Sequence, residues 1–395
     1  MGVPTPSAPA PGPTSPPVAA PVLPPPSAPP PPPPPPPAMP VRFALEWLLT
    51  HAAPPLQYRA IAEVAKINSP RASELAYAYA PAVQLAMTQQ PDGRWGKTML
   101  GIPSARAEHF EGVGTIPAVR RLLEYGWDRE SPPLARVRRL LFRLLAEDDD
   151  PAYLFEFAPG KGKPDEDATR RGRAILREAA ASALAQAGYE GDPRLRGAAR
   201  RILDRINAYL KSPLAQKPWM RVGNRQVLAP EAAPPTMNAL MMLAHMPFFR
   251  SEYHEHIERL YTFLTQPLPR QESAQLVGGT ITVQPHFVLG DMLPHRNAVE
   301  ADVPAALLWL EIMARLGFLR RNENWTKMLD RFADDCDRTG VWHPHKGMAM
   351  PRSASPFVWP MFPLEHSTAG DERWADVTLR IGIIARAAGR QIDLV

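Results

Sequence analysis

Charged side chains are absent from the first 40 residues, although this segment holds 21 of the chain's 50 prolines. A run such as SAPPPPPPPPPA has no backbone donors and no large apolar side chains, so it cannot build a core and should remain extended. We therefore predict a disordered proline-rich leader over residues 1–40, which would act as a spacer or a docking strip. Residues 41–395 are predicted to form the folded domain.

Cysteine and long apolar runs are also scarce. The single cysteine, Cys336, excludes a disulfide within the chain and mildly favours a reducing compartment. The most apolar stretch, VPAALLWLEIMARLGFL, is interrupted by Glu311 and Arg315, so we expect no membrane span. The amino terminus lacks a basic start followed by an apolar stretch, which argues against a signal peptide. A soluble, cytoplasmic protein is the default expectation.

The excess of positive charge is small, with 45 Lys and Arg against 40 Asp and Glu. In the runs VRRLLFRLL and ARRILDRINAYL the arginines stand at helical spacing opposite apolar residues, which is typical of solvated helix faces. No nucleic-acid motif accompanies them. We therefore expect no nucleic acid as a partner.

From residue 41 onward, apolar residues recur at spacings of three and four, and the alternation typical of strands is scarce. Four segments repeat one order: an apolar helix, a joint with Gly or Pro beside aromatics, and an amphipathic helix. The joints are 124–130, 186–193, 245–252 and 315–323. The first helices are apolar on most sides, so we predict that they lie inside and the second helices outside.

The links between these pairs are long, at 147–170, 211–234, 266–301 and 338–372. Links of this length are typical of functional loops or of loops with secondary structure of their own. The segment GGTITVQPHFVLGD predicts a short hairpin within the third link, and we expect no strands elsewhere. No second helix follows the last helix of the domain. Helices from the amino-terminal region can therefore pack against it and close the domain. We predict an all-α fold, an α/α toroid of inner and outer helices; an open solenoid is the alternative.

The segment QQPDGRWG, at 89–96, and a weaker copy, DRTGVW, at 337–342, support this architecture. They resemble the Gln, Asp-Gly, Trp signature of the prenyltransferase and squalene-cyclase repeat. That resemblance implies a terpenoid cyclase-like α/α toroid, in which Gln bridges, Asp-Gly turns the chain and Trp stacks on the next repeat. Glycine permits the backbone angles that end a helix, and tryptophan adds a large apolar area with one donor.

The catalytic motifs of that superfamily fit this chain poorly. Its protonating cyclases carry Asp-x-Asp-Asp, which is missing here, and the nearest acids are Glu300 and Asp302 before an apolar helix. Acids at such a position are commonly helix caps. The protein prenyltransferases bind zinc through Asp, Cys and His, for which the candidates here are Asp334, Cys336, His343 and His345. Cys336 also completes an apolar stripe, which favours a small buried core residue.

One link gathers the other candidate catalytic side chains. In QPHFVLGDMLPHRNAVEAD, imidazoles and carboxylates precede an inner helix, where such groups would act as acid and base. The candidate catalytic residues are Asp291, His295, Glu300 and Asp302. The candidate binding residues are His109, Glu111, His286 and Trp309.

The sequence alone favours a toroid that acts on or binds an apolar, isoprenoid-like molecule in its centre. Two alternatives stay open: a non-catalytic toroid that binds a ligand or a protein partner, and a carbohydrate-active lyase or hydrolase with Trp219 and Trp359 as stacking platforms. The sequence requires no cofactor, and zinc or magnesium are the ions that the candidate residue types would accommodate.

Overall fold

The computed structural model describes residues 1–2, 40–146, 166–293, 298–345, 350–367 and 369–395. The chain divides into two units, Met1–Ala38 and Met39–Val395. The leader predicted over residues 1–40 therefore lies almost entirely outside the described residues. All described helices and strands belong to the second unit.

The second unit begins with a series of short helices. They are α1 (Leu45–His51), α2 (Pro54–Arg59), the π-helix η1 (Ala60–Ala65), α3 (Pro70–Ala78) and α4 (Ala80–Met87). Proline occupies the first turn of α2, α3 and α4. The N–H groups of a first helical turn have no partner within the helix, so proline, which lacks an N–H, fits there. Each of these prolines therefore starts a new helix, and the segments stay short.

The four predicted helix pairs are confirmed. They are α5 (Thr115–Glu124) with α6 (Pro132–Leu144), α7 (Glu166–Gln186) with α8 (Pro193–Lys211), α9 (Met237–Ala244) with α11 (His254–Leu264), and α13 (Val303–Arg315) with α14 (Glu323–Asp334). The short helix α10 (Pro247–Glu252) occupies the third joint. In the other three joints Gly126, Gly188 and Gly317 adopt positive φ, the conformation that commonly ends a helix.

The first helix of each pair is the more deeply buried. Every residue of α9 is buried, and so are most residues of α13 and of the last helix, α15 (Ala375–Ala387). The second helices bury one stripe: Leu195, Ala199, Ile202 and Ile206 in α8, and Trp325, Met328, Leu329 and Phe332 in α14. Leu210 and Cys336, predicted to end these stripes, are half-buried.

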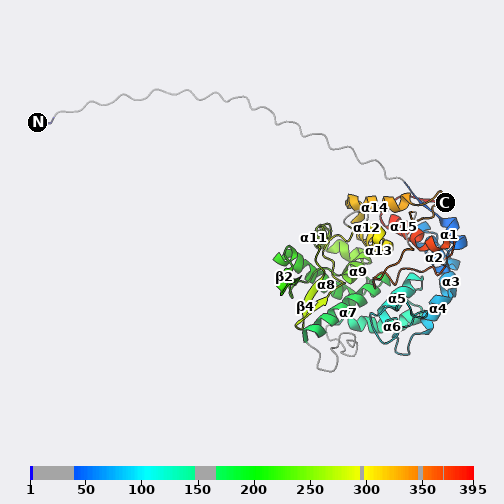
Figure 1. Cartoon of the computed structure of the whole chain (residues 1–395), viewed down its shortest axis with the longest axis horizontal. Helices are drawn as coiled ribbons and strands as arrows, with labels where there is room; N and C mark the ends of the chain where they lie inside the picture. The colour runs from blue at the N-terminus through cyan, green and yellow to red at the C-terminus, as the bar shows by residue number, and fades with distance from the viewer. Residues whose placement is uncertain (3–39, 147–165, 294–297, 346–349, 368) are drawn as a thin grey trace. The chain divides into compact units, whose positions relative to one another are not determined.

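The buried helices contact one another in chain order (Figure 1). Helix α5 packs against α7, α7 against α9, α9 against α13, and α13 against α15. Helix α15 then packs against α2 and η1 near the start of the unit, and α3 and α4 lead back to α5. The second unit is therefore helix-rich and built around an inner layer of helices.

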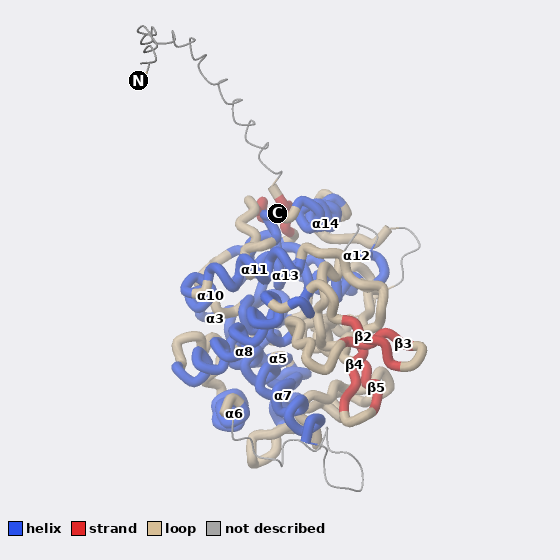
Figure 2. Tube along the Cα trace, turned by 90° about the vertical axis from the view of Figure 1, so that its left-hand side faces the viewer, coloured by secondary structure: helices blue, strands red, loops and turns tan. Residues whose placement is uncertain are grey.

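The prediction of strands at one place only is wrong. A hairpin in the third link is confirmed, formed by β4 (Ala274–Val277) and β5 (Thr280–Val283), although only β5 lies within the predicted segment 278–291. It joins β2 (Trp219–Val222) and β3 (Arg225–Leu228) in a sheet of order β2-β3-β4-β5 (Figure 2). Strand β3 runs parallel to β4, whereas both hairpins are antiparallel. The overlooked signal is Gly223-Asn224, a two-residue hairpin turn between β-forming residues.

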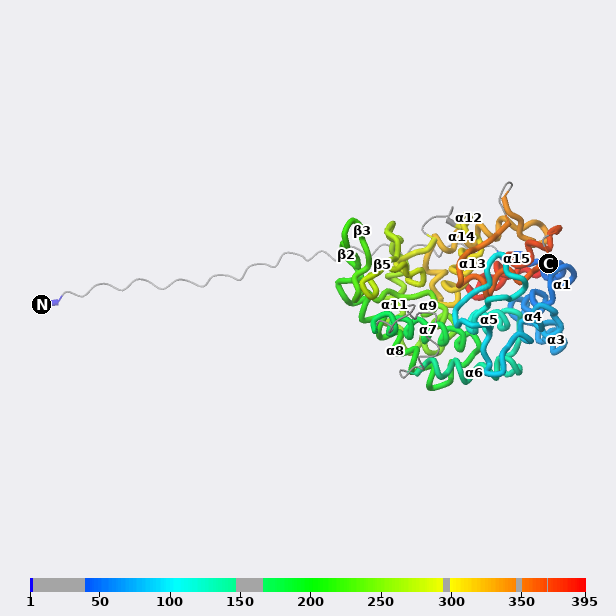
Figure 3. The backbone as a smooth tube through the Cα atoms, turned by 60° about the horizontal axis from the view of Figure 1, so that its bottom comes forward, coloured from blue at the N-terminus to red at the C-terminus, as the bar shows by residue number. Residues whose placement is uncertain are grey.

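A second small sheet joins the two ends of this unit (Figure 3). Strand β1 (Val41–Phe43) pairs in parallel with β6 (Ile392–Leu394). The remaining elements are α12 (Ala298–Ala301) and the 3₁₀ turns Pro213–Ala215, Leu319–Arg321 and Glu372–Trp374. Within the described residues, no helix is both long enough and apolar enough to cross a bilayer.

The two motif copies make the same attachment. The backbone N–H of Trp95 donates to Thr115 Oγ1 at 3.1 Å, at the start of α5, and the backbone N–H of Trp342 donates to Thr378 Oγ1 at 3.0 Å, in α15. Both indoles are buried. The side chain of Gln89 donates to the carbonyl of Pro133 at the start of α6. In each copy, the segment that carries the tryptophan is thus hydrogen-bonded to the inner helix that follows it in the chain.

Candidate binding cavity

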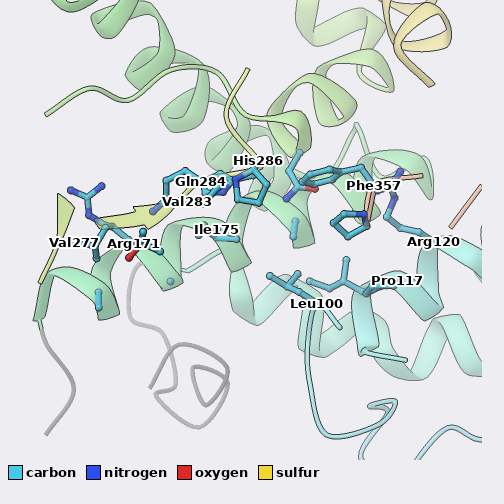
Figure 4. A pocket seen from close by; sticks show the side chains of 18 of the residues that line it. Leu100, Pro117, Arg120, Arg171, Ile175, Val277, Val283, Gln284, His286 and Phe357 are labelled. Carbon is cyan, nitrogen blue, oxygen red and sulfur yellow. The ribbon is translucent and has the colours of Figure 1, made fainter. Parts of the chain in front are cut away.

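A cavity of about 480 Å³ lies beside the first turns of α5 and α9 and along α7. The hairpin β4–β5 and residues 356–360 complete its wall (Figure 4). Apolar side chains form most of the lining, among them Leu100, Ile116, Pro117, Ile175, Val283 and Phe357. On α7, Gly172, Ile175 and Ala179 follow one another at spacings of three and four, so one helix face borders the cavity. The site is therefore mainly apolar.

A few polar side chains also reach the cavity. Asn238 and Gln284 are buried, His286 is half-buried, and their side chains form no hydrogen bond with the described residues. Burial lowers the pKa of His286 to about 4, so its imidazole is neutral at pH 7. None of the described residues that line the cavity is an Asp or a Glu. The cavity thus holds uncharged polar groups that a ligand would satisfy.

Arg120 is the charged side chain at the inner end of the cavity. It lies one helical turn beyond Ile116 on α5 and is 7% exposed. Its Nε donates to Gln186 Oε1 at 2.9 Å, and its Nη2 lies 3.0 Å from Met241 Sδ. Burial lowers the pKa of Arg120 to about 10, which still leaves the guanidinium charged at pH 7. Arg171, at the opposite end in Figure 4, is paired with Asp167.

Behind Arg120 the inner helices share a closed cycle of ion pairs, here called the ion ring. Its members are Arg59, Glu63, Glu124, Arg380, Glu311 and Arg315. Arg380 links Glu124 at 2.5 Å to Glu311 at 3.0 Å. Gln186 donates to Glu124 Oε1 at 2.7 Å and so connects the ring to Arg120.

The ion ring keeps its carboxylates charged despite their burial. Burial alone would raise the pKa of Glu124, but Arg380 and Arg59 hold that pKa far below its usual range. Against the same burial effect, Arg315 and Arg380 lower the pKa of Glu311 to about 2. Three cations and three anions therefore neutralise one another in this cycle.

A polar pocket of about 740 Å³ lies at the C-terminal ends of the inner helices. Glu124, Gln186, His245 and Arg315 line it. Burial lowers the pKa of His245 to about 3, and Arg315 adds to the effect, so this imidazole is also neutral at pH 7. The charged groups of the ring that face this pocket already have partners.

The predicted catalytic residues do not gather around the cavity. Asp291 is buried and accepts hydrogen bonds from Leu293 N and Trp325 Nε1, both at 2.9 Å. Asp302 caps α13 by accepting from Ala305 N at 2.9 Å. Glu300 pairs with Arg331 at an exposed position, and His295 lies outside the described residues. The three described acids thus hold local structure together.

Of the four predicted binding residues, only His286 lines the cavity. His109 and Glu111 are exposed. Trp309 is buried on α13, with its ring edge-on to Trp325 at a centroid distance of 6.2 Å. It therefore belongs to the packing between α13 and α14.

The four predicted metal ligands are not brought together. No group of three or more His, Cys, Asp or Glu in the described part of the chain has a metal-binding arrangement. His343 Nε2 contacts Asp337 at 3.1 Å, His345 Nε2 contacts Asp335 at 3.2 Å, and Asp334 is exposed. Burial raises the pKa of Cys336 to about 12, which disfavours the thiolate that zinc requires.

Sequence reasoning missed Arg120 and the ion ring. Arginines were expected on solvated helix faces, and this describes Arg139 and Arg143 of α6. It is wrong for Arg120 and Arg380, which are buried on inner helices. The available signal was charge within helices predicted to lie inside, because a charge on such a helix requires a buried partner.

Comparison with protein-family models, with curated proteins and with solved structures finds no match to this chain. The chemistry assigned to the cavity therefore rests on the residues of this chain alone.

Proposed function

We propose that residues 41–395 form a terpenoid cyclase-like α/α toroid and that its cavity binds an apolar, isoprenoid-like molecule. The observation that carries this proposal is the largely apolar lining contributed by three inner helices. A volume of about 480 Å³ lies within the ordinary range of small-molecule sites. Burial of an apolar ligand there would remove its surface from water, which is the main source of affinity for such molecules.

Two features support the toroid. The contacts between inner helices lead from α5 through α15 to α2 and back through α4 to α5. In addition, the backbone N–H of the tryptophan in both motif copies donates to a threonine of the following inner helix, so the two copies of the motif occupy equivalent positions.

Binding without chemistry is favoured over catalysis. Protonation of an apolar substrate needs a strong acid in the cavity, but the described lining has no carboxyl group and its imidazole, His286, is neutral. The carbohydrate-active alternative receives little support, because the lining is apolar. Trp359 is half-buried, stacked with Arg121, and its carbonyl accepts from the same arginine.

Farnesol binding to the full chain, measured by isothermal titration calorimetry, tests the proposal. Ile175→Trp places an indole at the cavity wall and is expected to abolish the binding by filling the space. Ile67→Trp makes the same exchange at an exposed position and should bind farnesol as the parent chain does. If the parent chain binds neither farnesol and dodecanol nor the corresponding acids, or if Ile175→Trp binds farnesol undiminished, the proposal is contradicted.

A further inference from the structure

The charges at the inner end of the cavity do not cancel. The ion ring contains three arginines and three glutamates, so its net charge is zero. Arg120 adds a fourth cation, and its side chain contacts the amide oxygen of Gln186 and the sulfur of Met241, neither of which carries charge. In the described residues no carboxylate lies within ion-pair distance of Arg120. One buried positive charge therefore remains beside an apolar cavity.

A buried cation without a counterion is costly, since burial removes its hydration. This cost lowers the pKa of Arg120 to about 10, with burial as the largest cause. The more distant Glu124 and Glu311 act to raise this pKa, and Arg380 acts to lower it. An anion in the cavity would offset the cost, because a charge-assisted hydrogen bond is strong where water is excluded.

A neutral donor lies near the same cation. Asn238 precedes Met241 by one helical turn on α9, so its side chain lies on the helix face that reaches Arg120. Its amide forms no hydrogen bond with the described residues. Arg171, the other arginine of the wall, is engaged by Asp167 at 2.8 Å, which it shares with Arg170, and donates to Gln275 Oε1 at 2.6 Å. This arrangement favours an anion at Arg120.

We propose that the ligand of this cavity is an anionic amphiphile, with its apolar tail along α7 and a single carboxylate head seated on Arg120. This inference rests on the proposed function and adds the chemical class of the ligand. A diphosphate head would need several cations or a bound metal. At its inner end the cavity offers one guanidinium that has no carboxylate partner, and the described residues contain no metal-binding group. The carboxylate is therefore the head group that matches the site.

The test compares ligands that share a tail and differ in the head. Isothermal titration calorimetry with the full chain measures farnesoic acid, farnesol and farnesyl diphosphate, and then dodecanoic acid and dodecanol. We expect each acid to bind roughly ten- to a hundredfold more tightly than its alcohol, as a charged hydrogen bond provides. Arg120→Met should remove this preference, so that acid and alcohol bind with affinities within about twofold of each other. Arg120→Lys should retain a preference for the acid.

Arg200→Met supplies the control for overall charge. It removes one exposed arginine from α8, a helix that contributes none of the described residues lining the cavity, and should retain the full preference for the acid. Thermal unfolding of each variant checks that it is folded.

The outcomes separate the two proposals. If the parent chain binds neither acids nor alcohols, the apolar cavity is not a ligand site and the proposed function fails. If acid and alcohol bind equally, or Arg120→Met keeps the preference for the acid, the proposed function stands and the carboxylate assignment is overturned. Tighter binding of farnesyl diphosphate than of farnesoic acid would also overturn it.

Discussion

Two neighbouring regions of the inner helices use buried arginine differently. In the ion ring, Arg380 lies between Glu124 and Glu311, and every charge has an opposite neighbour. At the inner end of the apolar cavity, Arg120 has only an amide and a thioether as direct partners. The comparison indicates that the paired charges fix the arrangement of helices, whereas the unpaired one is available to a ligand.

Arg380→Met should break the ion ring with the largest effect on stability. The substitution leaves two buried carboxylates without their shared cation, so the free energy of unfolding should fall by about 3–5 kcal/mol. Urea denaturation measures this value. Arg321→Met removes an exposed arginine paired with Glu258 and should cost about 1 kcal/mol or less. Equal losses in the two variants would remove the distinction between buried and exposed pairs.

Acid should destabilise the fold, because the polar pocket and the apolar cavity each contain one half-buried imidazole, that of His245 and that of His286. The pKa of His245 is about 3 and that of His286 about 4, both below the ordinary value of 6.5. The unfolded chain therefore binds more protons below pH 6.5, and stability that is present above that pH is lost as the pH falls toward 4. Each imidazole should contribute roughly 1 kcal/mol per pH unit in this window.

Urea denaturation at pH 7.5, 6.0 and 5.0 measures this slope. His245→Gln removes the imidazole of the polar pocket and His286→Gln that of the cavity, and each should make stability fall less steeply with acid than in the parent chain. A slope unchanged in the double variant would mean that both imidazoles take up protons normally in the folded chain.

Arg120→Met should have the smallest effect on the stability of the ligand-free chain. It removes an uncompensated cation, which is favourable, but it also leaves Gln186 Oε1 without its donor. We expect the two effects to offset each other to within about 1 kcal/mol in urea denaturation. A loss as large as that of Arg380→Met would make Arg120 a structural member of the ion ring.

Local patterns predicted much of the fold. Glycines at 126, 188 and 317 and the apolar periodicity around them located three helix pairs, because both signals act within a few residues. The site was harder to predict. Asp291 and Asp302 looked catalytic because they cluster in sequence, yet each accepts hydrogen bonds that hold its own segment in place.

The sequence by itself determined the helix pairs and their buried faces, since each depends on neighbours along the chain. Only the tertiary structure decided which arginines are buried and which of these are neutralised. Glu124 and Arg380 meet across 256 residues, and Arg120 meets Met241 across 121. No local signal in the sequence encodes pairing over such distances. Only the packing of the inner helices therefore leaves Arg120 at the end of the cavity without a carboxylate partner.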